Sequence, residues 1–124
     1  TCALPISGGY ATISGGYFNI ANGSFSTLGG GVQNTASGNC SFVGGGRLNT
    51  SSCSYSFTGG GLQNTTSGFA SFIGGGKCNT ASGSYSSVVG GCCNVAWSNL
   101  GFIGGGFKNT TCSAYSFTAD RCNL

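Results

Sequence analysis

The sequence predicts an all-β fold: a β-solenoid, or β-roll, of about eight coils, with one 15-residue repeat in each coil. The first observation behind this prediction is a file of asparagines that recur every 15 residues, at Asn19, Asn34, Asn49, Asn64, Asn79, Asn94 and Asn109. The second is a series of glycine triplets with the same period, at residues 29–31, 44–46, 59–61, 74–76 and 104–106. Apolar residues do not recur at intervals of three and four, so the pattern does not support helices.

Each unit is expected to contain two short strands and two corners. Numbered from the residue after its asparagine, the consensus of the unit is T-A-S-G-x-Y-S-F-V-G-G-G-x-x-N. Places 5–9 form one extended run, and places 13–15 continue into places 1–2 of the next unit as the other. The glycine triplet and the Ser-Gly pair separate them, and glycine permits the positive φ that sharp corners need. Successive coils should stack at about the 4.8 Å spacing of hydrogen-bonded strands.

The whole chain, residues 1–124, is predicted to be a single solenoid domain. Residues 1–4 form an N-terminal arm, and residues 5–19 form a degenerate first coil. Regular coils occupy residues 20–109, and residues 110–124 form a C-terminal cap coil in which Ala-Asp-Arg replaces the glycine triplet. Both ends depart from the consensus, as the terminal repeats of a solenoid do.

Alternation along the strands predicts which side chains face inward. Places 7, 9, 15 and 2 carry small or repeated residues, which suits a thin interior. Places 6 and 8 carry aromatic residues on the opposite face, and we interpret them as an assembly face: Phe25, Tyr55, Phe57, Phe72, Tyr85, Phe102, Tyr115 and Phe117. The opposite assignment, with the aromatic residues inside, stays open at this point because buried aromatic residues are the ordinary case.

The repeated asparagines are predicted to face inward as a structural ladder. Stacked amides can form hydrogen bonds from one coil to the next, as in the asparagine ladders of cross-β stacks. Such a ladder would also satisfy buried polar groups that otherwise cost stability.

The charged residues are few and exclude several functions. They are Arg47, Lys77, Lys108, Arg121 and Asp120. The cations are scattered along the sequence and predict no basic patch, so we expect no nucleic acid partner. With no His, no Glu and one Asp, neither paired carboxylates nor a Ser-His-Asp centre can form, so we expect no enzyme, no catalytic residues and no cofactor. The cysteines lack zinc-type spacing, so no metal is expected. No apolar run is long enough for membrane insertion.

Eight cysteines among 124 residues indicate disulfides and an oxidising, extracellular setting. Cys78 and Cys93 hold the same place in adjacent units. Their Cα atoms should therefore lie near the ~4.8 Å strand spacing, within the range of a disulfide. Cys40 and Cys53, two places out of phase but next to a corner, form a second candidate pair.

The ends of the solenoid predict self-assembly. A solenoid exposes strand edges at both ends, and exposed edges pair with other chains unless they are blocked. Residues 5–124 make eight whole units, so a following subunit could continue the coil in phase and build a filament of identical chains. Cys2 and Cys122 share place 13 and are candidates for an intersubunit bond, with bonding within one chain as the alternative. Cys92 and Cys112 complete the disulfide candidates.

Five N-x-[ST] sequons occur, and three of them fall on the asparagine ladder, at Asn49, Asn64 and Asn109. Ladder asparagines are also present where no sequon exists, so the ladder explains these three without glycans. Asn22 and Asn39 lie outside the ladder and are the better candidates for N-glycosylation.

The runs S-x-[VI]-G-G-G-x-x-N-T-A-S-G, as in residues 41–46 and 79–83, resemble the head repeats of trimeric autotransporter adhesins and related phage-fibre and environmental surface proteins. The resemblance covers the chain from Pro5 onward. It implies a β-roll of stacked coils in an extracellular stalk, head or fibre at a cell or virion surface. We therefore expect an extracellular structural or adhesive subunit that assembles with copies of itself.

A second function class stays open. Place 1 carries a file of threonines, and serines stand two residues further on in four of these units. A flat T-x-S array on a small, cysteine-rich solenoid is similar to ice-binding antifreeze solenoids, whose flat faces carry T-x-T rows. The alternative is that threonine simply suits strands.

Overall fold

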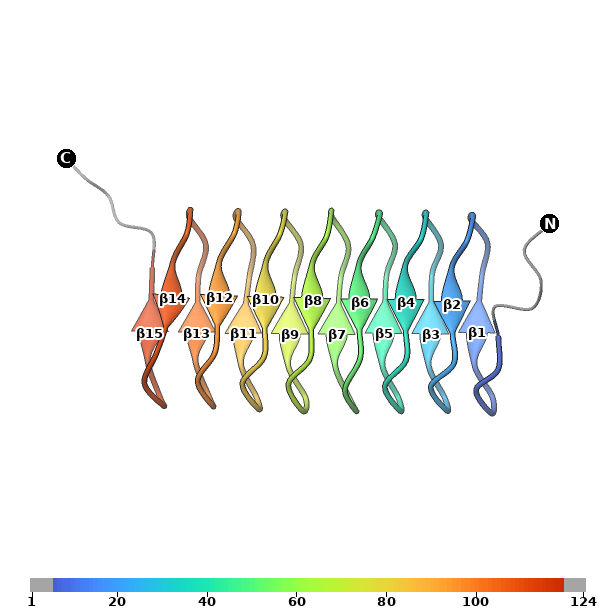
Figure 1. Ribbon diagram of the computed structural model, residues 1–124, viewed down its shortest axis with the longest axis horizontal. Helices are drawn as coiled ribbons and strands as arrows, with labels where there is room; N and C mark the ends of the chain where they lie inside the picture. The colour runs from blue at the N-terminus through green and yellow to red at the C-terminus, as the bar shows by residue number, and fades with distance from the viewer. Residues whose placement is uncertain (1–5, 120–124) are drawn as a thin grey trace.

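The computed structural model describes residues 6–119; residues 1–5 and 120–124, which include the predicted arm and the end of the predicted cap coil, lie outside the described range. The described chain is a straight rod of stacked coils in which strands alternate between two parallel sheets (Figure 1). Its two ends lie at opposite ends of the rod. The predicted fold class, an all-β solenoid with two strands per coil and a 15-residue repeat, is confirmed.

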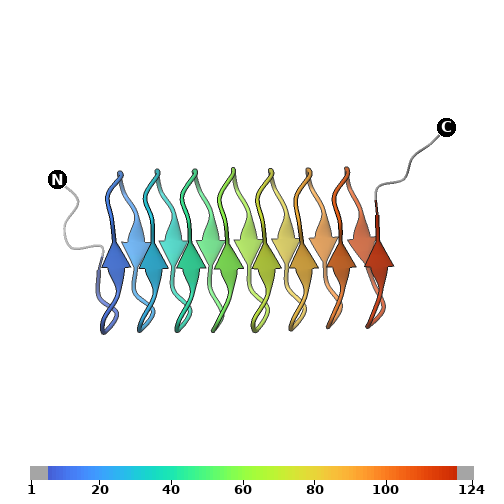
Figure 2. The same cartoon turned by 180° about the vertical axis from the view of Figure 1, so that it is seen from behind.

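The first sheet has eight strands, each formed by places 8 and 9 of a unit. They are β1 (Thr12–Ile13), β3 (Thr27–Leu28), β5 (Phe42–Val43), β7 (Phe57–Thr58), β9 (Phe72–Ile73), β11 (Ser87–Val88), β13 (Phe102–Ile103) and β15 (Phe117–Thr118). This sheet faces the viewer in Figure 2.

The second sheet has seven strands, each formed by places 1 and 2. They are β2 (Ile20–Ala21), β4 (Thr35–Ala36), β6 (Thr50–Ser51), β8 (Thr65–Thr66), β10 (Thr80–Ala81), β12 (Val95–Ala96) and β14 (Thr110–Thr111). Every strand pairs with the strand one unit away, in parallel and with a register of 15 residues, as in Thr65↔Thr80. This register brings equivalent residues of all units into straight rows.

The strands are shorter than the sequence predicted. Five-residue runs were expected, but each strand has two residues, and place 13 adds a single isolated bridge per unit. The reason is backbone conformation at two places that do not carry glycine. Places 6 and 14 adopt a left-handed conformation in every described unit, for example Tyr85 at φ 57° and Gln63 at φ 57°. Each such residue turns the chain and ends the extended run, at a cost of about 1–2 kcal/mol relative to a right-handed conformation.

The glycine corner is required by close contact between coils. Gly61 lies at φ 91°, and a Cβ there would collide with the carbonyl oxygen of Gly76 in the next coil. Only glycine lets the backbones approach at this point.

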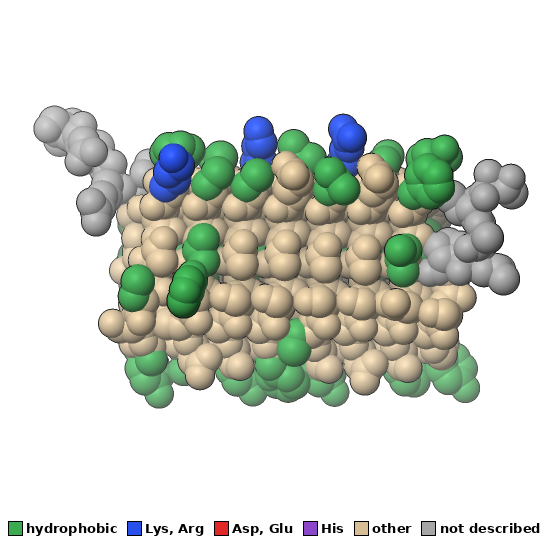
Figure 3. Space-filling view, in the orientation of Figure 1, with side chains coloured by type: hydrophobic (Ala, Val, Ile, Leu, Met, Phe, Trp, Pro, Cys, Tyr) green, Lys and Arg blue, Asp and Glu red, His purple; other side chains and the backbone are tan. Residues whose placement is uncertain are grey.

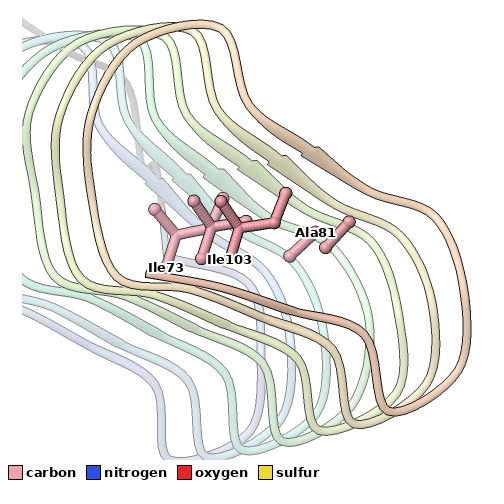
Figure 4. Close-up of a cluster of buried hydrophobic side chains, with 5 residues drawn as sticks. Ile73, Ala81 and Ile103 are labelled. Carbon is pink, nitrogen blue, oxygen red and sulfur yellow. The ribbon is translucent and has the colours of Figure 1, made fainter. Parts of the chain in front are cut away.

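The interior is thin, and apolar side chains fill it where the two sheets face each other. Places 2 and 9 point inward from the two sheets and meet between them, as Figure 4 shows for Ile73, Ala81 and Ile103. A second apolar cluster contains Leu28, Ala36 and Val43. The inward prediction for places 2, 7, 9 and 15 is confirmed, because these residues are buried in all the central coils.

A polar layer separates the two apolar clusters. Ser51, Thr58 and Thr66 are fully buried, and their hydroxyl groups form a closed triangle with oxygen–oxygen distances of 3.0, 3.0 and 2.9 Å. Each hydroxyl therefore has two partners, which offsets the cost of removing it from water.

Candidate interaction surfaces

The asparagine ladder lies inside the rod, as the sequence predicted. Asn34, Asn49, Asn64, Asn79 and Asn94 have no exposed surface. The bonding differs from the stacked-amide arrangement that was expected, because each amide bonds backbone groups. The Asn64 Oδ1 accepts the backbone N–H of Asn79 at 2.9 Å, and the Asn64 Nδ2 donates to the carbonyls of Gly60 at 2.8 Å and Gly76 at 2.9 Å. One side chain thus ties the glycine corner of its own coil to the next coil.

The predicted assembly face consists of two separate rows. The aromatic residues of place 8 stand on the outer face of the eight-stranded sheet, and those of place 6 stand at a corner. In the first row the rings of Phe42, Phe57 and Phe72 stack in parallel, with centroids 4.8 and 5.1 Å apart. In the second row Ala70 stands between Tyr55 and Tyr85, and Phe69 of place 5 packs edge-on between these two rings. Polar or small residues interrupt both rows, so they do not form the single continuous strip that the alternation suggested.

All eight aromatic residues of that face point outward rather than into the core. Tyr115 is 81% exposed and Phe117 is 70% exposed, whereas Phe57 and Phe102 are partly covered by neighbouring rings. The alternative with the aromatic residues inside is therefore wrong. The physical reason is the narrow gap between the sheets, which the side chains of places 2 and 9 already fill.

The seven-stranded sheet presents a polar face. Its place-1 residues form one straight row that contains five threonines; Ile20 stands at one end of the row, and Val95 interrupts the threonines. Figure 3 views this side of the rod and shows it mostly in tan, the colour of the backbone and of side chains that are neither hydrophobic nor charged. Ser52, Ser67 and Ser82 are exposed beside this row.

No disulfide joins the six described cysteines, which are Cys40, Cys53, Cys78, Cys92, Cys93 and Cys112. The predicted Cys78–Cys93 and Cys40–Cys53 bonds are therefore not present in this structure, and Cys2 and Cys122 lie outside the described residues. Cys78 and Cys93 do occupy the same place in adjacent coils. However, the Sγ of Cys93 lies 3.2 Å from the Sγ of Cys92, and the Sγ of Cys78 turns toward the Oε1 of Gln63 at 3.7 Å.

Three thiols thus gather at one corner. The hydrogen bond with Cys93 raises the pKa of the Cys92 thiol above its ordinary value, and partial burial and the nearby thiol of Cys78 act in the same direction. The positive charge of Lys77 opposes this shift.

The cations are not scattered in space, which corrects the interpretation of the sequence. Arg47 and Lys77 occupy place 13 and Lys108 occupies place 14, so all three stand on the same corner of the rod. Figure 3 shows them along one long edge, separated by apolar side chains. No carboxylate side chain occurs among residues 6–119, so none of these charges is neutralised within the described chain. The row is not apparent in the sequence because Arg47 and Lys77 are 30 positions apart and Lys77 and Lys108 are 31 positions apart.

The sequons fall into two groups. Asn49, Asn64 and Asn109 are buried in the ladder, where a glycan has no room. Asn22 and Asn39 are exposed. These two positions therefore remain the accessible candidates for N-glycosylation.

Two further observations concern the described residues alone. Between residues 6 and 119, no three His, Cys, Asp or Glu side chains gather so as to hold a metal ion. In the same range no helix is long and apolar enough to cross a membrane.

Comparison of the chain with protein-family models, with curated proteins and with solved structures gave no match.

Proposed function

We propose that this chain is an extracellular structural and adhesive subunit that assembles end to end into a fibre or a surface stalk. The observation that carries the proposal is the pair of open strand edges at the ends of the rod. Among residues 6–119, β1, β14 and β15 each pair with a neighbour on one side only, whereas the outer side of β2 is bridged at Ala21 by Ile6. Exposed strand edges of this kind pair with further strands unless something covers them.

The two edges are complementary to each other. At place 8 the backbone N–H of each coil donates to the place-7 carbonyl of the next coil, as Phe102 does to Ser116 at 2.8 Å. By the same pattern the N–H of Phe117 points away from the described coils, toward the position of a next coil. At the other end, the carbonyl of Ala11 is the equivalent acceptor, and no residue between 6 and 119 donates to it. A second copy stacked in phase would supply each group with its partner.

The proposed location at a cell or virion surface rests on other features. The chain has eight cysteines, which suit an oxidising compartment. Its two accessible sequons suit a secreted protein. Its repeat resembles those of adhesin heads and phage fibres. A rigid rod whose residues 6–119 include no His, Asp or Glu also fits a structural role better than an enzymatic one.

The assembly is tested with a substitution at the terminal edge. Phe117→Pro removes the N–H that would bond the next copy, and proline is tolerated where that N–H faces solvent. Phe117→Ala is the matched control, because it removes the same ring and keeps the N–H. Electron microscopy and sedimentation should show filaments for the native chain and for Phe117→Ala, and single rods for Phe117→Pro. Single rods for the native chain at all concentrations would overturn the proposal.

A second candidate function is ice binding, and the polar face of the seven-stranded sheet favours it. The threonine row is straight, uncharged and held rigidly by the coils beneath it. Thr65→Tyr would place a bulky ring in the middle of this row, and Ser87→Tyr would place the same ring on the opposite sheet. If the face binds ice, the native chain and Ser87→Tyr inhibit ice recrystallisation and Thr65→Tyr does not. Failure of the native chain to inhibit recrystallisation would exclude this candidate without affecting the first.

A further inference from the structure

We propose that the corner formed by places 13 and 14 is a docking edge for the surface of an anionic lipid bilayer. We call it the basic edge. Its cations are Arg47, Lys77 and Lys108, which lie two coils apart from one another. With strands about 4.8 Å apart, neighbouring cations are separated by about 10 Å. This distance is close to the screening length at physiological salt, so a charged surface interacts with the three together.

The charges on this edge are available to an external anion. The basic edge contains no carboxylate, and the described chain offers none elsewhere. The Nζ of Lys108 lies 5.1 Å from the ring centre of Phe107, which orders the side chain and leaves its charge unneutralised. A cationic row without internal partners is complementary to a surface of opposite sign.

Exposed apolar side chains on the basic edge favour a lipid surface over a linear polyanion in water. Phe107 is 62% exposed, Tyr17 is 55% exposed and Leu48 is 37% exposed, all on the same edge. A polyanion held by charge alone would leave these groups in water. At a bilayer interface, aromatic and aliphatic groups enter the headgroup region while lysine and arginine contact the phosphates.

The shape of the basic edge also favours a lipid surface over a linear polyanion. The chain turns sharply here, at the glycine of place 12 and the left-handed residue of place 14, so the side chains project from a convex ridge. Figure 3 shows that this ridge runs straight along the rod. A straight ridge can touch a flat surface along its whole length, whereas it offers no groove to enclose a polymer chain. The described coils alone carry this site, so the proposal does not depend on filament formation.

The test is co-sedimentation of the whole chain with vesicles. Phosphatidylcholine vesicles that contain phosphatidylserine are compared with vesicles of phosphatidylcholine alone. Each cation near an anionic membrane should contribute about a fivefold gain in affinity, so the preference for anionic vesicles should approach roughly 100-fold. The triple variant Arg47→Gln, Lys77→Gln and Lys108→Gln should lose this preference. Raising the salt concentration should weaken the binding of the native chain.

A matched variant separates lipid from polyanion binding. The double variant Leu48→Ser and Phe107→Ser keeps all the charges and removes two apolar groups. It should bind anionic vesicles more weakly than the native chain but bind heparin beads equally well. All substituted residues are surface residues, so circular dichroism and thermal unfolding should not change. To separate this site from assembly, Phe117→Pro should bind vesicles like the native subunit.

Three outcomes would overturn the inference. The first is equal binding to vesicles with and without phosphatidylserine. The second is undiminished binding of the triple variant. The third is retention on heparin beads without any binding to anionic vesicles, which would assign the edge to an acidic polymer instead.

Discussion

Removal of one ladder amide from the middle of the rod should destabilise the fold severely. In Asn64→Ala the chain loses three hydrogen bonds, one to the N–H of Asn79 and two to the carbonyls of Gly60 and Gly76. The three losses are not equal. The carbonyl of Gly76 still accepts the N–H of Leu62, at 2.9 Å, and Gly60 is partly exposed, so water can reach it. The N–H of Asn79 is buried and keeps no partner.

The magnitude follows from this difference. A buried donor left without a partner costs about 1–3 kcal/mol, and each of the other two bonds contributes about 0.5–1.5 kcal/mol. The sum is about 2–6 kcal/mol, with a central value near 4. The total stability of a domain is about 5–15 kcal/mol, so this one amide accounts for a large share of it. The loss falls between two coils, and in a solenoid each coil is held only by its neighbours.

The assay is urea unfolding followed by circular dichroism and by the fluorescence of Trp97, the only tryptophan. The control is Gln33→Ala, which removes an exposed amide that makes no side-chain hydrogen bond within residues 6–119. Gln33 stands directly before the ladder residue Asn34, as Gln63 stands directly before Asn64, and both glutamines have the same left-handed backbone conformation. We expect Gln33→Ala to stay within about 0.5 kcal/mol of the native chain. If Asn64→Ala falls within 1 kcal/mol of this control, the ladder does not hold the coils together and the reasoning is refuted.

Three further predictions follow from the core, the aromatic row and the thiols. Thr58→Val breaks the hydroxyl triangle and should cost about 1–2 kcal/mol. The triple variant Ser51→Ala, Thr58→Val and Thr66→Ala should be more stable than Thr58→Val, because it removes all three hydroxyl groups together and only the Phe42 carbonyl loses a close bond, the one that it accepts from Ser51 at 2.9 Å. Urea midpoints that rank the triple variant below Thr58→Val would contradict this. Phe72→Ser removes one ring pair and should cost about 0.5–1.5 kcal/mol of folding stability. If the aromatic row is a protein contact, the same substitution should weaken assembly by more than this. An unfolded variant would show instead that the row holds the fold. Under oxidising conditions Cys78 and Cys93 should form an inter-coil disulfide, which peptide mapping without reduction would detect. A Cys78 thiol that is still fully alkylated after oxidation would exclude the bond. Cys112 serves as the reference for an exposed thiol.

The repeat in the sequence was enough to predict the architecture. A strict 15-residue period with two glycine-bearing corners leaves stacked coils as the arrangement that satisfies every backbone group. The inward position of Asn64 and its equivalents also followed from the sequence, because an amide repeated in every unit needs a repeated partner. The outward aromatic residues, in contrast, stayed ambiguous until the width of the interior was known.

Other features depended on tertiary structure. The left-handed conformation at Tyr85 and Gln63 has no signal in residue type, since tyrosine and glutamine rarely adopt it, and it is imposed by the closure of each coil. The true partners of the Asn64 amide are backbone groups brought close by stacking. The row formed by Arg47, Lys77 and Lys108 arises because the 15-residue register places residues about 30 apart on one edge. The sequence by itself determined the period and the interior, whereas the surface was decided by the stacking, which turns distance along the chain into adjacency in space.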